Sequence, residues 1–249
     1  VAGPIVRARD FIPQMFRTPV VTRETLGEGL YLIICGLLKK SVISDYISVN
    51  FVDRIFDNPT LYSGLENLLG VYGYALQIYC DFSGYSDMAI GIALLLGFHF
   101  PINFNAPYRS VSITDFWRRW HISLSTWIRD YIYISLGGNR KGKLRQYVNL
   151  VITMLLGGLW HGASLNFVAW GGAHGIALAV HKFFRQEVLH HGRSFQSHGV
   201  RKWIAIVLTF HFVCFTWIFF RQKTFTAGWT MLRQIFFNFH AELWQQVCA

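Results

Sequence analysis

The feature that most constrains this chain is a glycine-rich stretch, residues 157–166, which interrupts two apolar runs over residues 148–160 and 167–180. It reads Gly-Gly-Leu-Trp-His-Gly-Ala-Ser-Leu-Asn and places the imidazole of His161 between two apolar segments. An ionisable group at membrane depth is costly unless it faces protein or water, and small residues let neighbouring backbones approach closely. The pattern therefore predicts a helical hairpin whose turn carries either a functional histidine or a hydrogen-bonded structural one.

The composition is that of an integral membrane protein. Of the 249 residues, 53% are hydrophobic and only 14% are charged, against roughly 25% charged residues in a soluble domain. The net charge of +10 comes from Lys and Arg residues that lie between apolar runs. This placement is typical of the cytoplasmic loops of a multi-pass protein, so we expect a lipid bilayer and no nucleic acid as partner.

The length fits a single domain over residues 1–249. Because the sequence opens on Val1 without a methionine or a signal peptide, we expect it to begin inside a longer protein. Residues 204–220 are the clearest membrane span, whereas residues 29–38 are apolar but short, and we expect Lys39-Lys40 to end that segment. Residues 224–247 predict an interfacial or incomplete further helix. The expected fold class is therefore all-α, with several transmembrane and re-entrant helices.

A polar island at residues 81–87 interrupts another apolar stretch. It reads Asp-Phe-Ser-Gly-Tyr-Ser-Asp, and we expect it to split the stretch into two helices, residues 68–80 and 86–98, with a break that lines a pore. Residues 101–108 contain two prolines and two asparagines, so they predict an ordered turn.

Residues 115–133 predict an amphipathic helix that lies in the membrane interface or re-enters beside a cavity. Four residues at helical spacing form an apolar stripe: Trp120, Leu124, Trp127 and Tyr131. Thr114 or Asp115 could cap its start. Simple surface amphipathicity explains the stripe, but it does not explain why Trp117 and His121 share a face four residues apart.

His161 and His121 are the candidate catalytic residues. A neutral imidazole, with an ordinary pKa of roughly 6.5, can take a proton from an alcohol and return it near neutral pH. His174 and His181 lie seven residues apart on one helical face and could line the same cavity, but we interpret them as packing histidines. The sequence contains no His-x-x-x-His pair, and no cysteine lies near His121 or His161. It therefore does not predict a metal site. The chain also lacks a Gly-x-Ser-x-Gly motif and a phosphate-binding loop.

Several motifs resemble those of the membrane-bound O-acyltransferase family, in its bacterial branch of polysaccharide O-acetylases. The two strongest surround the candidate histidines: Asp115-Phe116-Trp117-Arg118-Arg119-Trp120-His121 and Leu159-Trp160-His161-Gly162. Four further stretches carry the likeness over the whole chain: Ala-Gly-Pro-Ile-Val-Arg from Ala2, the polar island, Asn-Phe-Asn-Ala-Pro-Tyr from Asn103, and Thr-Trp-Ile-Phe-Phe-Arg from Thr216. The first and last of these favour the alginate-type O-acetylases over teichoic-acid D-alanyl transferases, which remain an alternative.

The resemblance implies a multispanning helical fold around a central funnel and tunnel, in a bacterial cytoplasmic (inner) membrane. It also implies that His161 is the essential catalytic histidine and that His121 is a second family histidine. The acyl group would pass from a cytoplasmic thioester, acetyl-CoA or another donor, to an extracytoplasmic hydroxyl. An extracytoplasmic polysaccharide acetyltransferase is the expected partner, and no tightly bound cofactor is implied. Family members begin with further spans before Ala2 and often continue beyond Ala249.

Further residues are candidates for substrate binding or support. Asp81 or Asp115 could hold an imidazole tautomer. Arg118 and the basic cluster at residues 140–145 could meet phosphates of a CoA-like donor, although membrane topology explains that cluster equally well. Three more candidates flank the histidines: Trp117, Trp160 and Asn166.

Two other classes of function stay open at this stage. A proton-coupled transporter could use the intramembrane histidines as a relay, but the chain has no inverted repeat and few carboxylates in its apolar segments. A non-catalytic scaffold of an export complex is conceivable, but it leaves both histidine motifs without a purpose.

Overall fold

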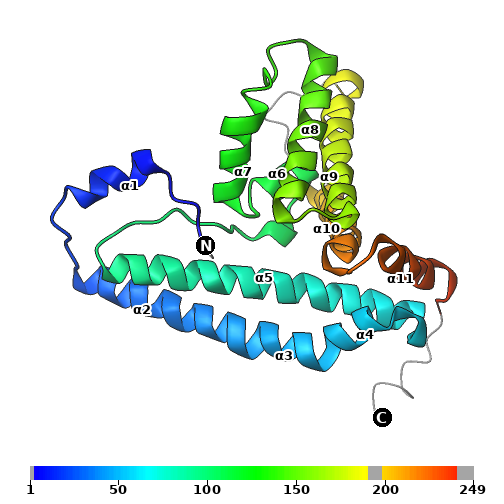
Figure 1. Cartoon of the computed structure of the whole chain (residues 1–249), viewed down its shortest axis with the longest axis horizontal. Coiled ribbons are helices and arrows are strands. Elements are labelled where there is room, and N and C mark those ends of the chain that lie inside the picture. The colour runs from blue at the N-terminus through cyan, green and yellow to red at the C-terminus, as the bar shows by residue number, and fades with distance from the viewer. Residues whose placement is uncertain (1–2, 190–197, 240–249) are drawn as a thin grey trace.

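The computed structural model describes residues 3–189 and 198–239, and the regular structure of these residues is entirely helical (Figure 1). A long layer is formed by α2 (Arg23–Leu37) and α5 (Gly64–Leu95), which pack side by side. A second group stands on this layer and consists of α8 (Lys143–His161), α9 (Leu165–Phe183) and α10 (Gly199–Arg221), with the short α6 (Ile113–Trp117) and α7 (Ile122–Ile128). The all-α prediction is confirmed for the described residues.

The first layer is a rod of helical turns packed against one long helix. The rod continues from α2 through η1 (Leu38–Ser44), α3 (Asp45–Ile47), η2 (Ser48–Val52) and α4 (Asp53–Asp57). Ser63 caps α5, accepting a hydrogen bond from the amide of Glu66 at 3.3 Å, and the Glu66 carboxylate accepts from the Ser63 amide at 2.7 Å. The predicted end of a short helix at Lys39-Lys40 is wrong, since the lysines continue the rod.

The predicted break at residues 81–87 is also wrong, because α5 runs through it. Its two carboxylates are neutralised by the neighbouring rod: Lys39 Nζ lies 2.5 Å from Asp87 Oδ2, and Lys40 Nζ lies 2.7 Å from Asp81 Oδ1. Gly84 does not break the helix either. A Cβ on Gly84 would lie 2.7 Å from the carbonyl oxygen of Gly36, so glycine is needed for close helix packing.

The predicted hairpin is confirmed, with α8 and α9 packed closely along their lengths. A Cβ on Gly158 would collide with the carbonyl of Phe167, and a Cβ on Gly171 would collide with the carbonyl of Met154. The turn lies between His161, the last residue of α8, and Ser164, whose hydroxyl caps α9.

The single helix predicted over residues 115–133 is replaced by three pieces. They are α6 (Ile113–Trp117), α7 (Ile122–Ile128) and the π-helical η5 (Arg129–Tyr133). The ordered turn predicted at 101–108 is present and causes the break, because it pairs with residues 119–122. The Asn105 amide donates to Arg119 O at 3.0 Å, and the Ile122 amide donates to Asn103 O at 2.9 Å.

As a result, Trp117 and His121 do not share a helical face. His121 instead adopts a left-handed conformation with φ +42°, which is uncommon for a residue with a side chain. The start of α6 is capped by Ser112, which accepts the Asp115 amide at 3.2 Å, and neither Thr114 nor Asp115 serves as the cap.

The predicted span at 204–220 is confirmed as the core of α10. Within the described residues, α10 is the one helix that is long and apolar enough to cross a membrane on composition alone. Part of the predicted segment 224–247 forms α11 (Phe225–Phe237), and its residues beyond 239 lie outside the described part of the chain. The N-terminal α1 (Ala8–Met15) and α11 lie at opposite ends of α5 (Figure 1).

Candidate active site

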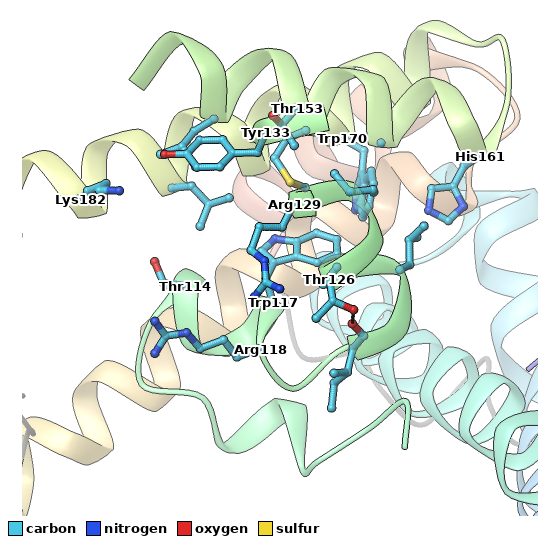
Figure 2. Close-up of a pocket in the computed structure, with 18 residues that line it drawn as sticks. Thr114, Trp117, Arg118, Thr126, Arg129, Tyr133, Thr153, His161, Trp170 and Lys182 are labelled. Atoms are coloured by element: carbon cyan, nitrogen blue, oxygen red, sulfur yellow. Dashed lines mark hydrogen bonds between the residues drawn. The ribbon is translucent and has the colours of Figure 1, made fainter. Parts of the chain in front are cut away.

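A cavity of about 390 Å³ separates α6, α7 and η5 from the α8–α9 hairpin. Figure 2 shows the imidazole of His161 at one end of this cavity and the side chains of Thr114, Arg118 and Lys182 at the other. The walls are mostly apolar, with hydroxyl groups between them from Thr126 and Thr153. This is the composition of a small-molecule site, in which an apolar pocket carries a few polar groups.

His161 occupies the cavity end without a hydrogen-bond partner among the described residues. Its ring is held by aromatic side chains instead: the ring centroids of Trp170 and Phe220 lie 5.4 Å and 5.0 Å away, both in edge contact. Trp160, which is exposed, packs against the same ring at 5.0 Å. Packing without hydrogen bonds fixes the ring and leaves its nitrogen atoms available for a substrate.

The turn after His161 is tied to the end of α10. The buried side chain of Asn166 donates to the Gln222 carbonyl at 2.5 Å, and Gln222 in turn donates to Phe56 O at 2.9 Å. Asn166 therefore acts on the position of the hairpin turn and makes no contact with the cavity. Phe220, which packs on His161, is held by the same junction.

His121 is buried and lies close enough to His161 for an electrostatic interaction between the two imidazoles. Its Nδ1 lies 3.2 Å from Oδ1 of Asn103. The ring of Phe82 packs edge-on against it with centroids 4.6 Å apart. The structure thus places the two predicted histidines in one region, although they are separated by a helix break and a hairpin.

Trp117 is hydrogen-bonded to His174 and to neither candidate catalytic histidine. Its indole Nε1 donates to Nδ1 of His174 at 3.2 Å, and Nε2 of His174 lies 2.9 Å from the hydroxyl of Thr216. Since Nδ1 accepts, the neutral ring carries its proton on Nε2 and donates it to Thr216, which donates to Val213 O at 2.8 Å. His174 is fully buried and satisfied, as the packing interpretation predicts. His181 meets Thr114 Oγ1 at 3.1 Å and lies outside the cavity lining.

The two candidate carboxylates make ion pairs with other residues. Asp115 Oδ1 lies 2.9 Å from Arg119 Nε, and Asp81 pairs with Lys40 on the α2–α5 layer. Neither carboxylate is hydrogen-bonded to a histidine among the described residues. The side-chain partner of His121 is an amide, Asn103, which the sequence motifs contained but did not single out.

The end of the cavity away from His161 is basic. Arg118 lines it and Lys182 reaches it from α9, whereas Arg129 lies in the middle of the cavity beside Trp117 (Figure 2). Arg129 Nε donates to Asp130 at 2.7 Å, and Arg7 NH1 lies 2.6 Å from the same carboxylate. The Arg129 and Arg7 guanidinium groups lower the pKa of Asp130 to about 2, so this carboxylate stays charged and partly offsets both arginines.

Sequence reasoning missed Trp170 and Phe220, whose rings pack against His161. Trp170 belongs to an apolar pattern that is typical of any buried helix, so no signal separates it from the other aromatic residues. Phe220 lies within the Thr-Trp-Ile-Phe-Phe-Arg motif, which the sequence analysis did not connect with the site. No group of three metal-ligating side chains occurs within residues 3–189 and 198–239.

Comparison with known proteins adds an independent finding. Residues 1–221 match the family described as "MBOAT, membrane-bound O-acyltransferase family". The chain is 45% identical over 95% of its length to "Probable alginate O-acetylase AlgI" of Pseudomonas fluorescens, and covers 46% of that protein. It is 42% identical over 94% of its length to "Peptidoglycan O-acetyltransferase" of Helicobacter pylori, and covers 44% of it. To "Teichoic acid D-alanyltransferase" of Bacillus subtilis it is 33% identical over 90% of its length, covering 58% of that protein. The chain therefore spans about half the length of these relatives.

Proposed function

Because the chain belongs to the membrane-bound O-acyltransferase family, a family of multi-pass membrane acyltransferases, we propose that it is an O-acetyltransferase for an exported polysaccharide. The donor is a cytoplasmic acyl thioester such as acetyl-CoA, and the acceptor is a hydroxyl on a cell-surface glycan of which alginate is an example. The protein resides in a bacterial cytoplasmic membrane. The observation that carries this proposal is the imidazole of His161, which has no hydrogen-bond partner in residues 3–189 and 198–239 and lies at the end of a cavity whose other end is basic.

His161 acts as the general base. Its imidazole takes the proton of the acceptor hydroxyl, and the oxygen attacks the carbonyl carbon of the thioester, so that a C–O bond forms and the C–S bond breaks. The proton then passes from the imidazolium to the departing thiolate, which restores the neutral histidine. General base catalysis of this kind contributes typically about 10²–10⁴-fold to a rate.

The cavity supports this chemistry by its shape and its charges. A volume of about 390 Å³ accommodates the flexible arm of a thioester donor beside His161. Arg118 and Lys182 at the far end, with Arg129 in the middle of the cavity, match the phosphates that such a donor carries. His121, within electrostatic reach of His161, shares or orients the transferred proton.

The names of the relatives support a glycan as the acceptor. The two relatives with "O-acetylase" or "O-acetyltransferase" in their names are 45% and 42% identical to this chain, whereas the D-alanyl transferase is 33% identical. We therefore favour acetyl transfer to a glycan over D-alanyl transfer to a teichoic acid. The transfer reaches the glycan directly or through an extracytoplasmic acetyltransferase partner that carries the acetyl group on a serine. Membership of an acyltransferase family leaves the proton-coupled transporter without support.

The test uses the full chain in membranes with a labelled acetyl thioester and the surface glycan of its host. We expect His161→Gln to lower acetyl incorporation by at least about 10²-fold, with the same amount of inserted protein. His99→Gln is the matched control, since the His99 side chain is exposed and its backbone makes the hydrogen bonds. Normal incorporation by His161→Gln would remove the proposed base, and absence of transfer by the unmodified chain would remove the proposed reaction.

A further inference from the structure

The buried side chain of Asn103 bonds to two other segments of the chain, and a third segment reaches it through Ser123. Its Oδ1 lies 3.2 Å from His121 Nδ1, 3.2 Å from the Ser123 amide nitrogen and 2.7 Å from the Ser123 hydroxyl. Its Nδ2 donates to the Ser86 hydroxyl at 3.2 Å, and the Ser123 hydroxyl also accepts the Ile5 amide at 2.9 Å. The Ala-Gly-Pro-Ile segment, the polar island of α5 and the Asn-Phe-Asn turn therefore converge behind His121.

The orientation of the Asn103 amide follows from its partners. The backbone N–H of Ser123 can only donate, so the atom that it meets at 3.2 Å must be the oxygen of the amide. The same oxygen can only accept. His121 Nδ1 must therefore carry a hydrogen and donate it to Asn103.

This hydrogen bond decides the tautomer of His121. With the proton of the neutral ring on Nδ1, the lone pair lies on Nε2, which has no hydrogen-bond partner among the described residues. The left-handed backbone of His121 is held by the same region, because the next amide, that of Ile122, donates to Asn103 O at 2.9 Å. Backbone strain of this kind persists where the surrounding structure fixes it, and it occurs often at functional sites.

We propose that Asn103 is a positioning residue, which fixes His121 as the neutral Nδ1–H tautomer with Nε2 free to exchange a proton during transfer. This inference rests on the proposed acyl transfer. An amide oxygen fixes the tautomer without a negative charge, whereas a carboxylate in its place would stabilise the imidazolium. Phe82 packs on the ring without a charge, and His161 is the ionisable group that acts on His121 electrostatically.

The test replaces Asn103 in two ways. Asn103→Asp keeps the shape, and the hydroxyls of Ser86 and Ser123 with the Ser123 amide can donate to the carboxylate. We expect the acid limb of the transfer rate against pH to move upward by about one to two pH units, with rates regained at alkaline pH. Asn103→Ala removes the acceptor, so kcat falls about 10-fold or more at every pH while KM for the thioester stays within about 2-fold.

Asn149→Asp and Asn149→Ala are the matched controls. Asn149 is equally buried, donates to the carbonyls of Leu136 and Gly138, and is hydrogen-bonded to neither catalytic histidine. Damage to folding alone lowers the yield of these variants and leaves the pH profile of the surviving protein unchanged. An Asn103→Asp profile that coincides with that of the unmodified chain would overturn the inference.

A second readout keeps this test separate from the proposed function. Hydrogen–deuterium exchange at the imidazole C2 position, followed by mass spectrometry against pH, reports the pKa of His121 without any turnover. We expect Asn103→Asp to raise this pKa by about one to two units and Asn149→Asp to leave it unchanged. An unchanged value in Asn103→Asp contradicts the role of Asn103 even if acetyl transfer is established. A raised value supports the positioning role even if the chain transfers another group.

Discussion

The α2–α5 layer and the α8–α9 hairpin both contain closely packed helices, but their polar residues lie in different environments. Both bring helices together through glycines, at Gly36 and Gly84 in the layer and at Gly158 and Gly171 in the hairpin. In the layer, lysines 39 and 40 neutralise the aspartates of α5. In the hairpin, His161 lies beside a cavity and has no hydrogen bond to the part of the chain that the structure describes. A polar group in an apolar segment is thus structural where it is paired and available for chemistry where it is not.

The largest effect on this comparison is expected from the glycines of the hairpin. Gly158→Ala or Gly171→Ala would push a Cβ into the carbonyl of Phe167 or Met154, so the helices must separate. We expect a loss of about 1–3 kcal/mol in the free energy of unfolding and a loss of acetyl transfer, because Gly158 lies one turn before His161. Thermal unfolding in detergent and the transfer assay measure the two effects.

Gly172→Ala is the control for these variants. Its added Cβ would lie 3.5 Å from the nearest atom, Leu155 Cδ2, which is an ordinary contact. If Gly171→Ala were as stable and active as Gly172→Ala, close backbone packing would not be what holds the hairpin.

A smaller effect, and one confined to stability, is expected from the ion pair of the layer. Lys39→Met or Asp87→Leu leaves one partner uncompensated, with side chains that are 31% and 20% exposed. We expect each single substitution to cost about 1–3 kcal/mol, and the double substitution to recover most of this loss. A double-mutant cycle of thermal unfolding measures the coupling. Transfer per folded molecule should stay unchanged, and a loss of transfer in the double variant would mean that this pair also serves the reaction.

The sequence predicted those parts of the fold that depend on neighbouring residues. The hairpin around residue 161, the turn at 101–108 and the span within α10 follow from local apolar runs, glycines and prolines. The polar island was misinterpreted because its partner is distant in the chain. Asp87 pairs with a lysine 48 residues earlier, and hydropathy along a single helix contains no trace of that contact.

The same distinction between local patterns and contacts of distant residues applies to the candidate site. His161 and His121 were identified from motifs and from the chemistry of imidazole. The amide that orients His121 lies 18 residues earlier, and the carboxylates expected in that role form ion pairs with Arg119 and Lys40. The spacing of residues could not show whether an amide or a carboxylate orients His121, because the helix break at His121 arises from backbone pairing with the Asn-Phe-Asn turn.

The smallest effects are expected where the end of α10 meets α4, at Arg221 and Lys223. Basic residues usually gather on one side of a membrane span, whereas α10 has them at both ends. Arg221 lies 2.6 Å from Asp53 with side chains 29% and 34% exposed, whereas Lys223 lies 3.4 Å from Asp57 with side chains 82% and 53% exposed. Both cations face carboxylates, so this end of α10 carries little net positive charge. We expect Arg221→Met to cost about 1 kcal/mol and Lys223→Met less than about 0.5 kcal/mol of unfolding free energy.

The same two variants also separate stability from activity at the hairpin. Arg221 follows Phe220, whose ring lies 5.0 Å from that of His161, so losing the ion pair loosens one wall of the candidate site. We therefore expect Arg221→Met to reduce acetyl transfer about 2- to 5-fold beyond its loss of folded protein, which corresponds to a rise of about 0.4–1 kcal/mol in the activation free energy. Lys223→Met, with its exposed partner, should transfer normally. Equal activity in both variants would show that packing around His161 does not depend on this ion pair.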